Sequence, residues 1–279
     1  MLLIADSGAT KTEWLIRDSG KWRDTILTMG YNPWHQSDKQ LDQSISALKM
    51  QLDFSAVERL VFYGAGCGAA VNRQKVAEVL KRFFPETTIE VNHDLLAAAH
   101  ALFGNTAGIA CILGTGSNAC VYDGQAVILQ IPSLGYILGD EGSGAIIGKM
   151  ICQAYFRNQL PENLAADFYS VYQLQLPEFL ENVYKKPASA AYLADFTRFA
   201  WRHKENAFIQ ALLADAFDGF IDKQIGYFQQ IKPLTIGFTG SVAFHFAKLL
   251  QERLDINGYK AGKILKSPAK GLMQYYDKL

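Results

Sequence analysis

The fold is decided by a short turn near the start of the chain, Asp6-Ser7-Gly8-Ala9-Thr10-Lys11-Thr12. The turn follows an apolar run, Leu2–Ala5, and leads into a second strand-like run, Lys11–Arg17. Its small residues let backbone N–H groups approach an anion, while its hydroxyls and Lys11 add donors and positive charge. Asp6 stands at the carboxyl end of the first strand, where a carboxylate can hold a magnesium ion through water.

This turn is only moderately specific when taken alone, because ordinary hairpins use the same residue types. It is not a Walker P-loop, since G-x-x-x-x-G-K is absent and a strand follows instead of a helix. Its meaning therefore depends on what recurs elsewhere in the chain.

The strand–turn–strand pattern of residues 2–17 recurs at residues 109–122, where the turn reads Gly114-Thr115-Gly116-Ser117. We interpret this as a degenerate internal duplication. The chain has 279 residues, which is comfortable for two domains. We expect an N-terminal domain over residues 1–107 and a C-terminal domain over residues 108–279, with a final helix from Pro268 that could pack back on the first domain.

Hydrophobic periodicity and turn residues predict the elements of each half. In the first half we expect strands at 2–5, 11–17, 21–28, 60–63 and 88–91, and helices at 37–51, 71–84 and 95–103. In the second half we expect strands at 108–113, 118–122, 125–131, 234–238 and 261–265. Helix should dominate residues 145–230, and a further helix is expected at 242–254.

Three more segments place ligand-binding residue types at strand ends. Residues 134–144 hold four glycines around Asp140 and Glu141, which suits a ligand with hydroxyl groups, although Asp140 could instead cap the next helix. Residues 237–242 form a glycine-containing strand-to-helix turn, on which a flat ligand could lie. Asp94 opens a helix, so it is either an N-cap or a general base that orients a hydroxyl.

The order of these pieces is more informative than any one of them, because each lies where a strand ends and open α/β sheets bind ligands there. In this order the sequence resembles the actin, sugar-kinase and heat-shock chaperone ATPase superfamily. Within it, the sequence is similar to the N-acetylglucosamine kinase branch, grouped with the BadF/BadG-type ATPases. The Gly-Asp-Glu-Gly-Ser string at 139–143 is especially typical of that branch.

The resemblance implies an α/β protein of two ribonuclease H-like, actin-like ATPase domains with a cleft between them. It also implies ATP and Mg²⁺ as cofactors, a small amino sugar as substrate, and Asp94 as the catalytic base. The implied nucleotide contacts are Asp6 (to Mg²⁺ through water), Gly8, Thr10, Lys11, Thr12, Gly114, Thr115, Gly116, Ser117, Gly240 and Ser241. The implied sugar contacts are Asn32, Asn118, Gly135, Tyr136, Asp140 and Glu141.

Composition excludes several other classes of function. Lysine plus arginine and aspartate plus glutamate each number 27, so the charge balance gives no case for nucleic acid or an anionic membrane surface as a partner. No apolar run reaches the roughly 20 residues of a membrane span, and the N-terminal run ends in an acid, unlike a signal peptide. We therefore expect a cytoplasmic protein.

Two other hypotheses stay open on the sequence. The first is an ATPase that activates a redox partner, but the chain offers no cysteine pair for a shared iron–sulfur cluster, since its four cysteines form no C-x-x-C pair. The second is a non-catalytic sugar or nucleotide sensor. Aromatic residues of the central segment (Phe156, Tyr169 and Tyr172) could form a homodimer face, and core packing is the alternative.

Overall fold

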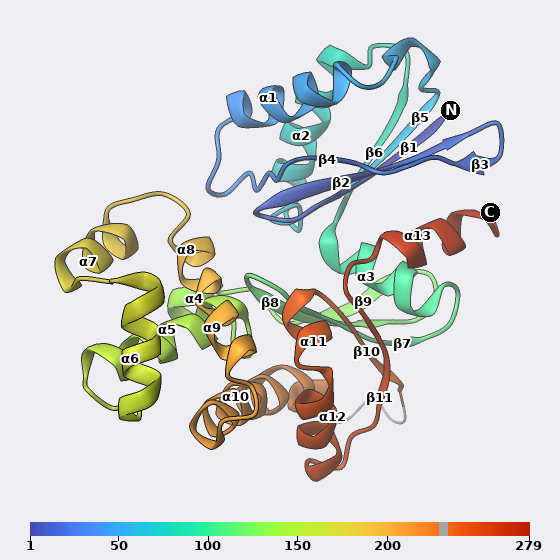
Figure 1. Cartoon of the computed structure of the whole chain (residues 1–279). Helices are drawn as coiled ribbons and strands as arrows, with labels where there is room; N and C mark the ends of the chain where they lie inside the picture. Colours follow the sequence, from blue (N-terminus) through green and yellow to red (C-terminus); the bar gives the residue numbers. More distant parts are fainter. Residues whose placement is uncertain (229–233) are drawn as a thin grey trace. The chain divides into compact units, whose positions relative to one another are not determined.

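The computed structural model describes residues 1–228 and 234–279 and divides the chain into two compact units. Unit 1 contains residues 1–104 together with residues 268–279, and unit 2 contains residues 105–267. Each unit is built on its own β-sheet (Figure 1).

The sheet of unit 1 has the strand order β3-β2-β1-β5-β6, and β4 also pairs with β2. Strands β1 and β2 form an antiparallel hairpin, whereas β1–β5 and β5–β6 are parallel. The strands are β1 (Leu2–Ser7), β2 (Lys11–Asp18), β3 (Lys21–Trp22), β4 (Ile26–Met29), β5 (Arg59–Gly64) and β6 (Thr88–His93). The apolar faces of β1, β2 and β5 lie in the core of this unit, where Trp14 and Phe62 are fully buried.

The prediction of one strand over residues 21–28 is wrong. The segment forms two short strands that pair with opposite ends of β2, through Arg17↔Trp22 and Trp14↔Ile26. Residues 23–25 lie outside both strands, although the Arg23 N–H still donates to the Ile16 carbonyl at 2.9 Å and the Arg23 side chain forms an ion pair with Asp18.

The helices of unit 1 are α1 (Asp38–Lys49), α2 (Ala70–Phe83), α3 (Asp94–Phe103) and α13 (Ala269–Tyr276), with a 3₁₀ turn η1 at Phe54–Ala56. Ser37 is the N-cap of α1, as predicted, and it forms a capping box with Gln40. Helix α13 is separated from α3 by most of the chain, yet the two pack closely: a Cβ atom at Gly271 would lie 2.4 Å from the Ala101 carbonyl oxygen.

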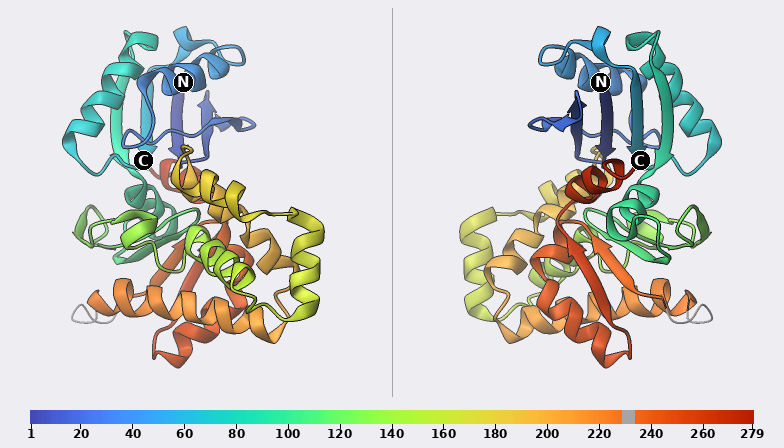
Figure 2. Two further views of the ribbon diagram at one scale, coloured as in Figure 1. Left: turned by 90° about the vertical axis from the view of Figure 1, so that its left-hand side faces the viewer. Right: turned by 90° about the vertical axis from the view of Figure 1, so that its right-hand side faces the viewer.

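Helix α13 is also held by polar contacts to the strands of unit 1. The Tyr63 hydroxyl lies 2.8 Å from the Tyr276 hydroxyl, and Arg17 donates to the Tyr276 carbonyl at 3.1 Å. Trp22 Nε1 donates to Asp277 at 3.0 Å. The two views in Figure 2 show α13 beside α3.

The sheet of unit 2 has the order β11-β10-β7-β8-β9. Its strands are β7 (Gly108–Leu113), β8 (Ser117–Tyr122), β9 (Val127–Gln130), β10 (Ile236–Thr239) and β11 (Ala261–Leu265). As in unit 1, the first two strands form an antiparallel hairpin, and two later strands join parallel to the first. This shared topology confirms the predicted internal repeat.

The helices of unit 2 are α4 (Gly135–Leu138), α5 (Gly144–Phe156), α6 (Glu162–Tyr172), α7 (Leu176–Tyr184), α8 (Ser189–Asp195), α9 (Thr197–Arg202), α10 (Ala207–Phe220), α11 (Ser241–His245) and α12 (Ala247–Ile256). Helix α10 continues as a π-helical segment η2 (Ile221–Ile225) and a 3₁₀ turn η3 (Gly226–Phe228). The predicted helical region 145–230 is confirmed up to residue 228, and Gln229 and Gln230 lie outside the described residues. The predicted helix 242–254 is instead two helices, which meet at Phe246.

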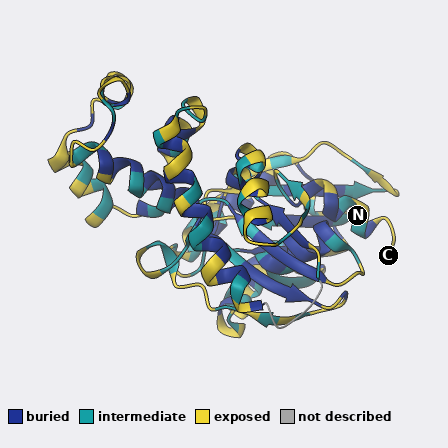
Figure 3. Ribbon diagram, turned by 90° about the horizontal axis from the view of Figure 1, so that it is seen from below, coloured by how far each residue is buried: buried dark blue, intermediate teal, exposed yellow. Residues whose placement is uncertain are grey.

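The central helices supply most of the core of unit 2 (Figure 3). Phe168 is fully buried and packs against the rings of Tyr155, Tyr172 and Phe199. Tyr172 therefore belongs to the core, whereas Tyr169 is 52% exposed. Among the described residues, no helix is both long enough and apolar enough to cross a membrane.

Candidate active site

The parallel strands of unit 1 bring two carboxylates to one edge of the sheet. Asp6 on β1 is in register with Tyr63 on β5, and Tyr63 is in register with Asn92 on β6. Asp94 follows two residues later, as the first residue of α3. Both carboxylates therefore lie at the carboxyl ends of the strands, which is where α/β sheets bind ligands.

Asp94 is not the N-cap of α3, so that alternative is wrong. The cap is His93, whose Nδ1 atom accepts from the Leu96 N–H at 3.3 Å. The Asp94 carboxylate accepts from the adjacent Leu95 N–H at 2.9 Å and from the backbone N–H of Asp94 itself. Burial raises the pKa of Asp94 to about 6, although backbone donors oppose the shift. A half-buried carboxylate with this pKa suits a general base near neutral pH.

The surroundings of Asp6 also disfavour the ionised form of its carboxyl group. Burial raises its pKa to about 7, the charges of Glu13 and Asp94 add to the shift, and Lys11 opposes it. Several carboxylates that disfavour one another's ionisation form a suitable place for a cation. No group of three or more possible ligand side chains is placed to hold a metal ion in the described part of the chain. The residues thus fit a Mg²⁺ ion held chiefly by phosphates and water, with Asp6 beside it.

The first turn exposes its backbone while its flanking hydroxyls are buried. Gly8, Thr10 and Lys11 are exposed, and the Gly8 N–H donates to the Lys11 carbonyl at 3.0 Å. By contrast, Thr12 Oγ1 is buried, lies 2.8 Å from Ser7 Oγ and donates to the Met29 carbonyl at 3.2 Å. The Thr12 hydroxyl is therefore engaged inside the protein, and the exposed atoms of the turn are those of residues 8–11.

The second turn is fixed by the start of α5. The N–H groups of Gly144 and Ala145 donate to the carbonyls of Gly114 and Thr115, at 2.8 and 3.0 Å. Ser117 Oγ is buried and has no hydrogen-bond partner among the described residues. An unpartnered buried hydroxyl is costly unless something else satisfies it, which is consistent with a ligand at this turn.

The Gly-Asp-Glu-Gly loop lies against the second turn. Asp140 adopts a left-handed backbone conformation, with φ of 58°. Its carboxylate accepts from the Ser117 N–H and packs on Gly116, where a Cβ atom would lie 3.0 Å from Asp140 Oδ2. Burial raises the pKa of Asp140, and the bond from Ser117 opposes the shift. Ser143, not Asp140, is the N-cap of α5, so the capping alternative for Asp140 is wrong.

The other predicted sugar contacts of unit 2 are Glu141, Asn118, Gly135 and Tyr136. Glu141 forms an ion pair with Lys223 at 3.1 Å. Asn118 Oδ1 accepts from the Ala119 N–H at 2.9 Å. Gly135 and Tyr136 open the short helix α4, and the Tyr136 carbonyl lies 3.5 Å from the Lys149 ammonium group.

The turn after β10 depends on a glycine. Gly240 has φ of 119°, and a Cβ atom there would lie 2.2 Å from the Leu113 carbonyl oxygen. Its N–H donates to the Leu265 carbonyl at 3.0 Å, which ties β11 to this turn. Ser241 follows as the exposed first residue of α11. This turn, which carries the predicted nucleotide contacts Gly240 and Ser241, is thus packed against the end of β7, next to Gly114.

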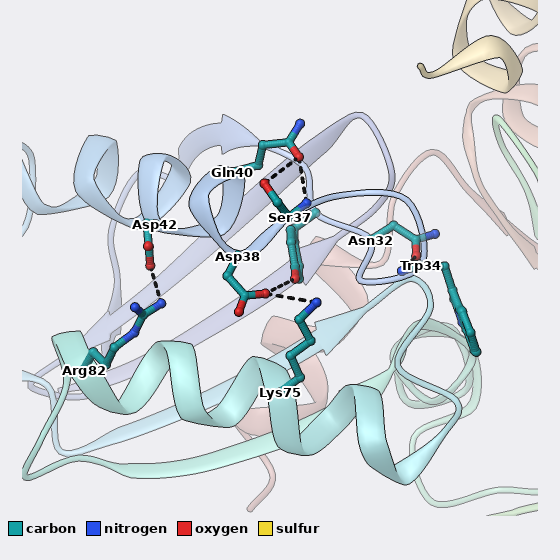
Figure 4. Close-up of polar contacts among 9 residues, drawn as sticks. Asn32, Trp34, Ser37, Asp38, Gln40, Asp42, Lys75 and Arg82 are labelled. Atoms are coloured by element: carbon teal, nitrogen blue, oxygen red, sulfur yellow. Dashed lines mark hydrogen bonds and ion pairs between the residues drawn. The ribbon is translucent and has the colours of Figure 1, made fainter. Parts of the chain in front are cut away.

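Asn32 lies in the loop between β4 and α1, residues 30–37, which we name the acceptor loop (Figure 4). Its Oδ1 atom accepts from the Trp34 N–H at 3.0 Å, and its own N–H donates to Gln36 Oε1 at 2.6 Å. The amino group of the Asn32 side chain turns away from that contact. The bond from Trp34 orients the Asn32 side chain, and the bond to Gln36 fixes its backbone.

Two residues beside Asn32 were missed by sequence reasoning. Gly66, in the loop after β5, faces Asn32 Oδ1 so closely that a Cβ atom would lie 2.2 Å from it. Trp34 is 65% exposed, and its ring stands at the outer end of the acceptor loop (Figure 4). The glycines at 64 and 66 were a signal for Gly66, whereas a lone tryptophan in a loop carries none.

No protein-family model and no curated protein matches the chain. Among solved structures, it is similar to a candidate N-acetylglucosamine kinase from Porphyromonas gingivalis, with a TM-score of 0.93 and 37% identity over 100% of this chain and 99% of the other. A second candidate N-acetylglucosamine kinase, from Chromobacterium violaceum, has a TM-score of 0.74 and 19% identity over 98% of both chains.

A more distant match is a ROK-family glucokinase from Streptomyces griseus, which was solved with glucose and AMPPNP. Its TM-score is 0.57, with 14% identity over 99% of this chain and 98% of the other. Because their sequence identities to this chain are only 19% and 14%, the Chromobacterium and Streptomyces structures support the fold alone.

Proposed function

The chain belongs to the N-acetylglucosamine kinase-like family of the actin-like sugar kinases, and on that premise we propose that it transfers the γ-phosphoryl group of ATP to a hydroxyl of an amino sugar such as N-acetylglucosamine. The observation that carries the proposal is the position of Asp94. His93, not Asp94, caps helix α3, so the Asp94 carboxylate is not needed as a cap. Asp94 lies at the same edge of the sheet as the turn that follows Asp6.

Asp94 would orient the acceptor hydroxyl and take its proton as the oxygen attacks phosphorus. A carboxylate with a pKa near 6 is mostly ionised at pH 7 and remains basic enough to accept that proton. Asn32, held by Trp34 and Gln36, would donate from its amino group to a sugar oxygen. Asp140, fixed by Ser117, would accept from another sugar hydroxyl, and Asn118, Gly135, Tyr136 and Glu141 are proposed as further contacts.

The exposed Thr10 and Lys11 would bind phosphate oxygens through their hydroxyl and ammonium groups, which stabilise the charge of a transferring phosphoryl group. Gly8, whose N–H donates to the Lys11 carbonyl, would leave room for the phosphate to approach the turn. Ser117 would donate its hydroxyl, which has no partner among the described residues, to a phosphate oxygen. Thr115 and Gly116 would add backbone donors beside Gly114, whose own N–H donates to the Gly116 carbonyl. Gly240 and Ser241 would contact the nucleoside. Mg²⁺, held near Asp6 through water, would neutralise charge on the phosphates.

The alternative of a redox-partner activator is not favoured, because all four cysteine side chains are buried and none is displayed for a cluster shared with another subunit.

The test is an ADP-release assay with Mg-ATP against a panel of amino sugars, including N-acetylglucosamine, glucosamine and N-acetylmuramic acid, with a no-sugar control. We expect strong stimulation by one sugar, which names the acceptor. ATP hydrolysis that no sugar stimulates would overturn the kinase proposal and turn the search to protein partners.

A further inference from the structure

Ser7 is a buried residue at the end of β1 that joins three segments through one hydroxyl group. Its Oγ lies 2.8 Å from Thr12 Oγ1 on β2 and accepts from the Tyr31 N–H at 3.2 Å. Ser7 and Tyr31 are both fully buried, so no water is at hand to replace either partner. The hydroxyl therefore connects the phosphate-binding turn to the first part of the acceptor loop.

The backbone of Ser7 makes a second connection to the surroundings of Asn32. Its carbonyl accepts from the Ala65 N–H at 2.8 Å. Ala65 precedes Gly66, on which Asn32 Oδ1 packs. Ser7 thus contacts the residue before Asn32 through its side chain and the loop behind Asn32 through its carbonyl.

The acceptor loop has its own internal bonds, and these fix its shape but not its place. Gln36 bridges the Asn32 N–H and the Gly30 carbonyl, and the Trp34 N–H closes on Asn32. Beyond the end of the loop, the carboxylate of Asp38 accepts from the Tyr31 hydroxyl at 3.3 Å. The loop is placed beside the phosphate turn by the β2–β4 ladder, which ends at Lys11↔Met29, by the Gly30 N–H, which donates to the Thr10 carbonyl at 3.1 Å, and by Ser7 Oγ, which also lies 3.5 Å from the Tyr31 carbonyl.

Comparison with the corresponding hairpin of unit 2 shows that the Ser7 hydroxyl is not required for the hairpin itself. In register, Ser7 pairs with Thr12 on β2 just as Leu113 pairs with Ser117 on β8. Unit 2 therefore forms a corresponding hairpin, with a three-residue turn (114–116) where unit 1 has four residues (8–11) and with a leucine in the place of Ser7, and Ser117 Oγ is left without a partner among the described residues. The hairpin fold does not require the hydroxyl pair, so in unit 1 the pair serves the loop that carries Asn32.

We propose that Ser7 is a positioning residue that holds the acceptor loop in register with the phosphate turn, so that Asn32 presents the sugar to the phosphoryl group at the right distance. This role rests on the proposed kinase function. Phosphoryl transfer depends on alignment of the attacking oxygen, and a misplacement of about 1 Å can reduce the rate roughly 10²-fold. A small shift of the loop would therefore be felt in catalysis although Ser7 touches no substrate.

The test compares Ser7→Ala with a matched control, Ser44→Ala. Ser44 is an equally buried serine of the same unit, and its Oγ bonds to the Met29 carbonyl and Thr28 Oγ1, both at 2.7 Å, between α1 and β4. Each variant removes a buried hydroxyl, but only Ser7→Ala leaves the Tyr31 N–H without its acceptor. We expect both variants to lose thermal stability, because each loses the hydrogen bonds of a buried hydroxyl.

For Ser7→Ala we expect the KM for the acceptor sugar to rise roughly tenfold while the KM for ATP changes less than about twofold. In Ser44→Ala we expect both KM values to stay near those of the wild type. An unchanged sugar KM in Ser7→Ala, or an equal rise in both variants, would overturn the proposal.

A second readout does not depend on turnover. Amide hydrogen exchange over residues 30–37 should become faster in Ser7→Ala than in the wild type and in Ser44→Ala. If the wild type phosphorylates no sugar, the proposed function fails, and the exchange rates still decide whether Ser7 holds the loop. If amide exchange over residues 30–37 were unchanged in Ser7→Ala, the proposed role of Ser7 in holding the loop would be refuted, whatever the activity of the protein.

Discussion

Gly66 and Asn32 are in van der Waals contact across two loops, and the contact leaves no room for a side chain at residue 66. A Cβ atom there would lie 2.2 Å from Asn32 Oδ1 and 3.0 Å from Trp34 Cδ1. The backbone of Gly66 also has a positive φ, of 76°, which other residues adopt only with strain. Sterics and backbone conformation thus both reserve this position for glycine.

Gly66→Ala should therefore displace Asn32 and raise the KM for the acceptor sugar, by roughly ten- to a hundredfold, because the amide would lose its preset orientation. The measurement is steady-state kinetics with ATP at saturation. Gly68→Ala is the matched control, since a Cβ atom at residue 68 meets nothing within 4 Å. A similar KM in both variants would show that Asn32 does not bind the sugar.

Asp94→Asn should reduce kcat roughly 10²-fold or more, because asparagine has no basic oxygen with which to take the acceptor proton. Nucleotide affinity should survive, since the exposed turn at residues 8–11 is unchanged. ADP release and a binding titration with a non-hydrolysable nucleotide measure the two effects separately. Asp42→Asn, which breaks only a surface ion pair with Arg82, is the control. Full turnover by Asp94→Asn would refute its role as base.

The activity should depend on pH through Asp94. Its pKa of about 6 means that the carboxylate is protonated at lower pH and cannot act as a base. We expect kcat/KM to fall by about tenfold per pH unit below pH 6 and to be level above pH 7. A pH profile from 5 to 8.5 tests this, and a profile with no inflection near 6 would contradict it.

The same raised pKa has an effect of opposite sign on stability. Because the folded state raises the pKa of Asp94 from 3.8 to about 6, it binds the proton more tightly than the unfolded chain does. Stability is therefore greatest below the unfolded value and is lost as the pH rises through 6. At pH 8, Asp94→Asn should be more stable than the wild type by about 1–2 kcal/mol, less than the full shift because the carboxylate is partly exposed. Thermal melts at pH 5 and 8 measure it, and equal melting temperatures at pH 8 would contradict it.

Gly240→Ala should weaken ATP binding and destabilise unit 2. A Cβ atom at Gly240 would lie 2.2 Å from the Leu113 carbonyl oxygen, so the turns after β10 and β7 would have to separate. We expect the KM for ATP to rise by about tenfold or more. Gly258→Ala is the control that distinguishes a steric clash from backbone strain. Gly258 also has a positive φ, of 77°, but a Cβ atom there meets nothing within 4 Å. If both variants behaved alike, the contact with Leu113 would not matter for ATP binding.

Much of the fold followed from local patterns. The two Gly/Thr turns, each between strand-like runs, predicted both hairpins, and the apolar runs predicted the parallel strands with errors of one or two residues. The wrong prediction at residues 21–28 came from treating a mixed stretch as one strand, although the polar residues 23–25 separate Trp22 from Ile26 and the two short strands pair with different ends of β2. Likewise, periodicity alone does not show the break at Phe246 between α11 and α12.

The candidate site could be predicted as a set of residues but not as an arrangement. Sequence spacing placed Asp94 at a strand end, yet it did not show that His93 would take over the cap. It also assigned Thr12 by residue type, whereas the structure directs that hydroxyl toward Ser7 and Met29. Gly66 acts through a contact with a loop more than 30 residues earlier, and such contacts are set by packing rather than by local pattern.

Helix α13 has a consequence for the order in which the protein is completed during synthesis. Residues 268–279 belong to unit 1 and supply Tyr276 and Asp277 to contacts with β2, β3 and β5. The ribosome makes them only after the whole of unit 2. The N-terminal unit therefore begins to form first but is finished last, and until then the surface of α3 that receives Gly271 stays uncovered on the nascent chain.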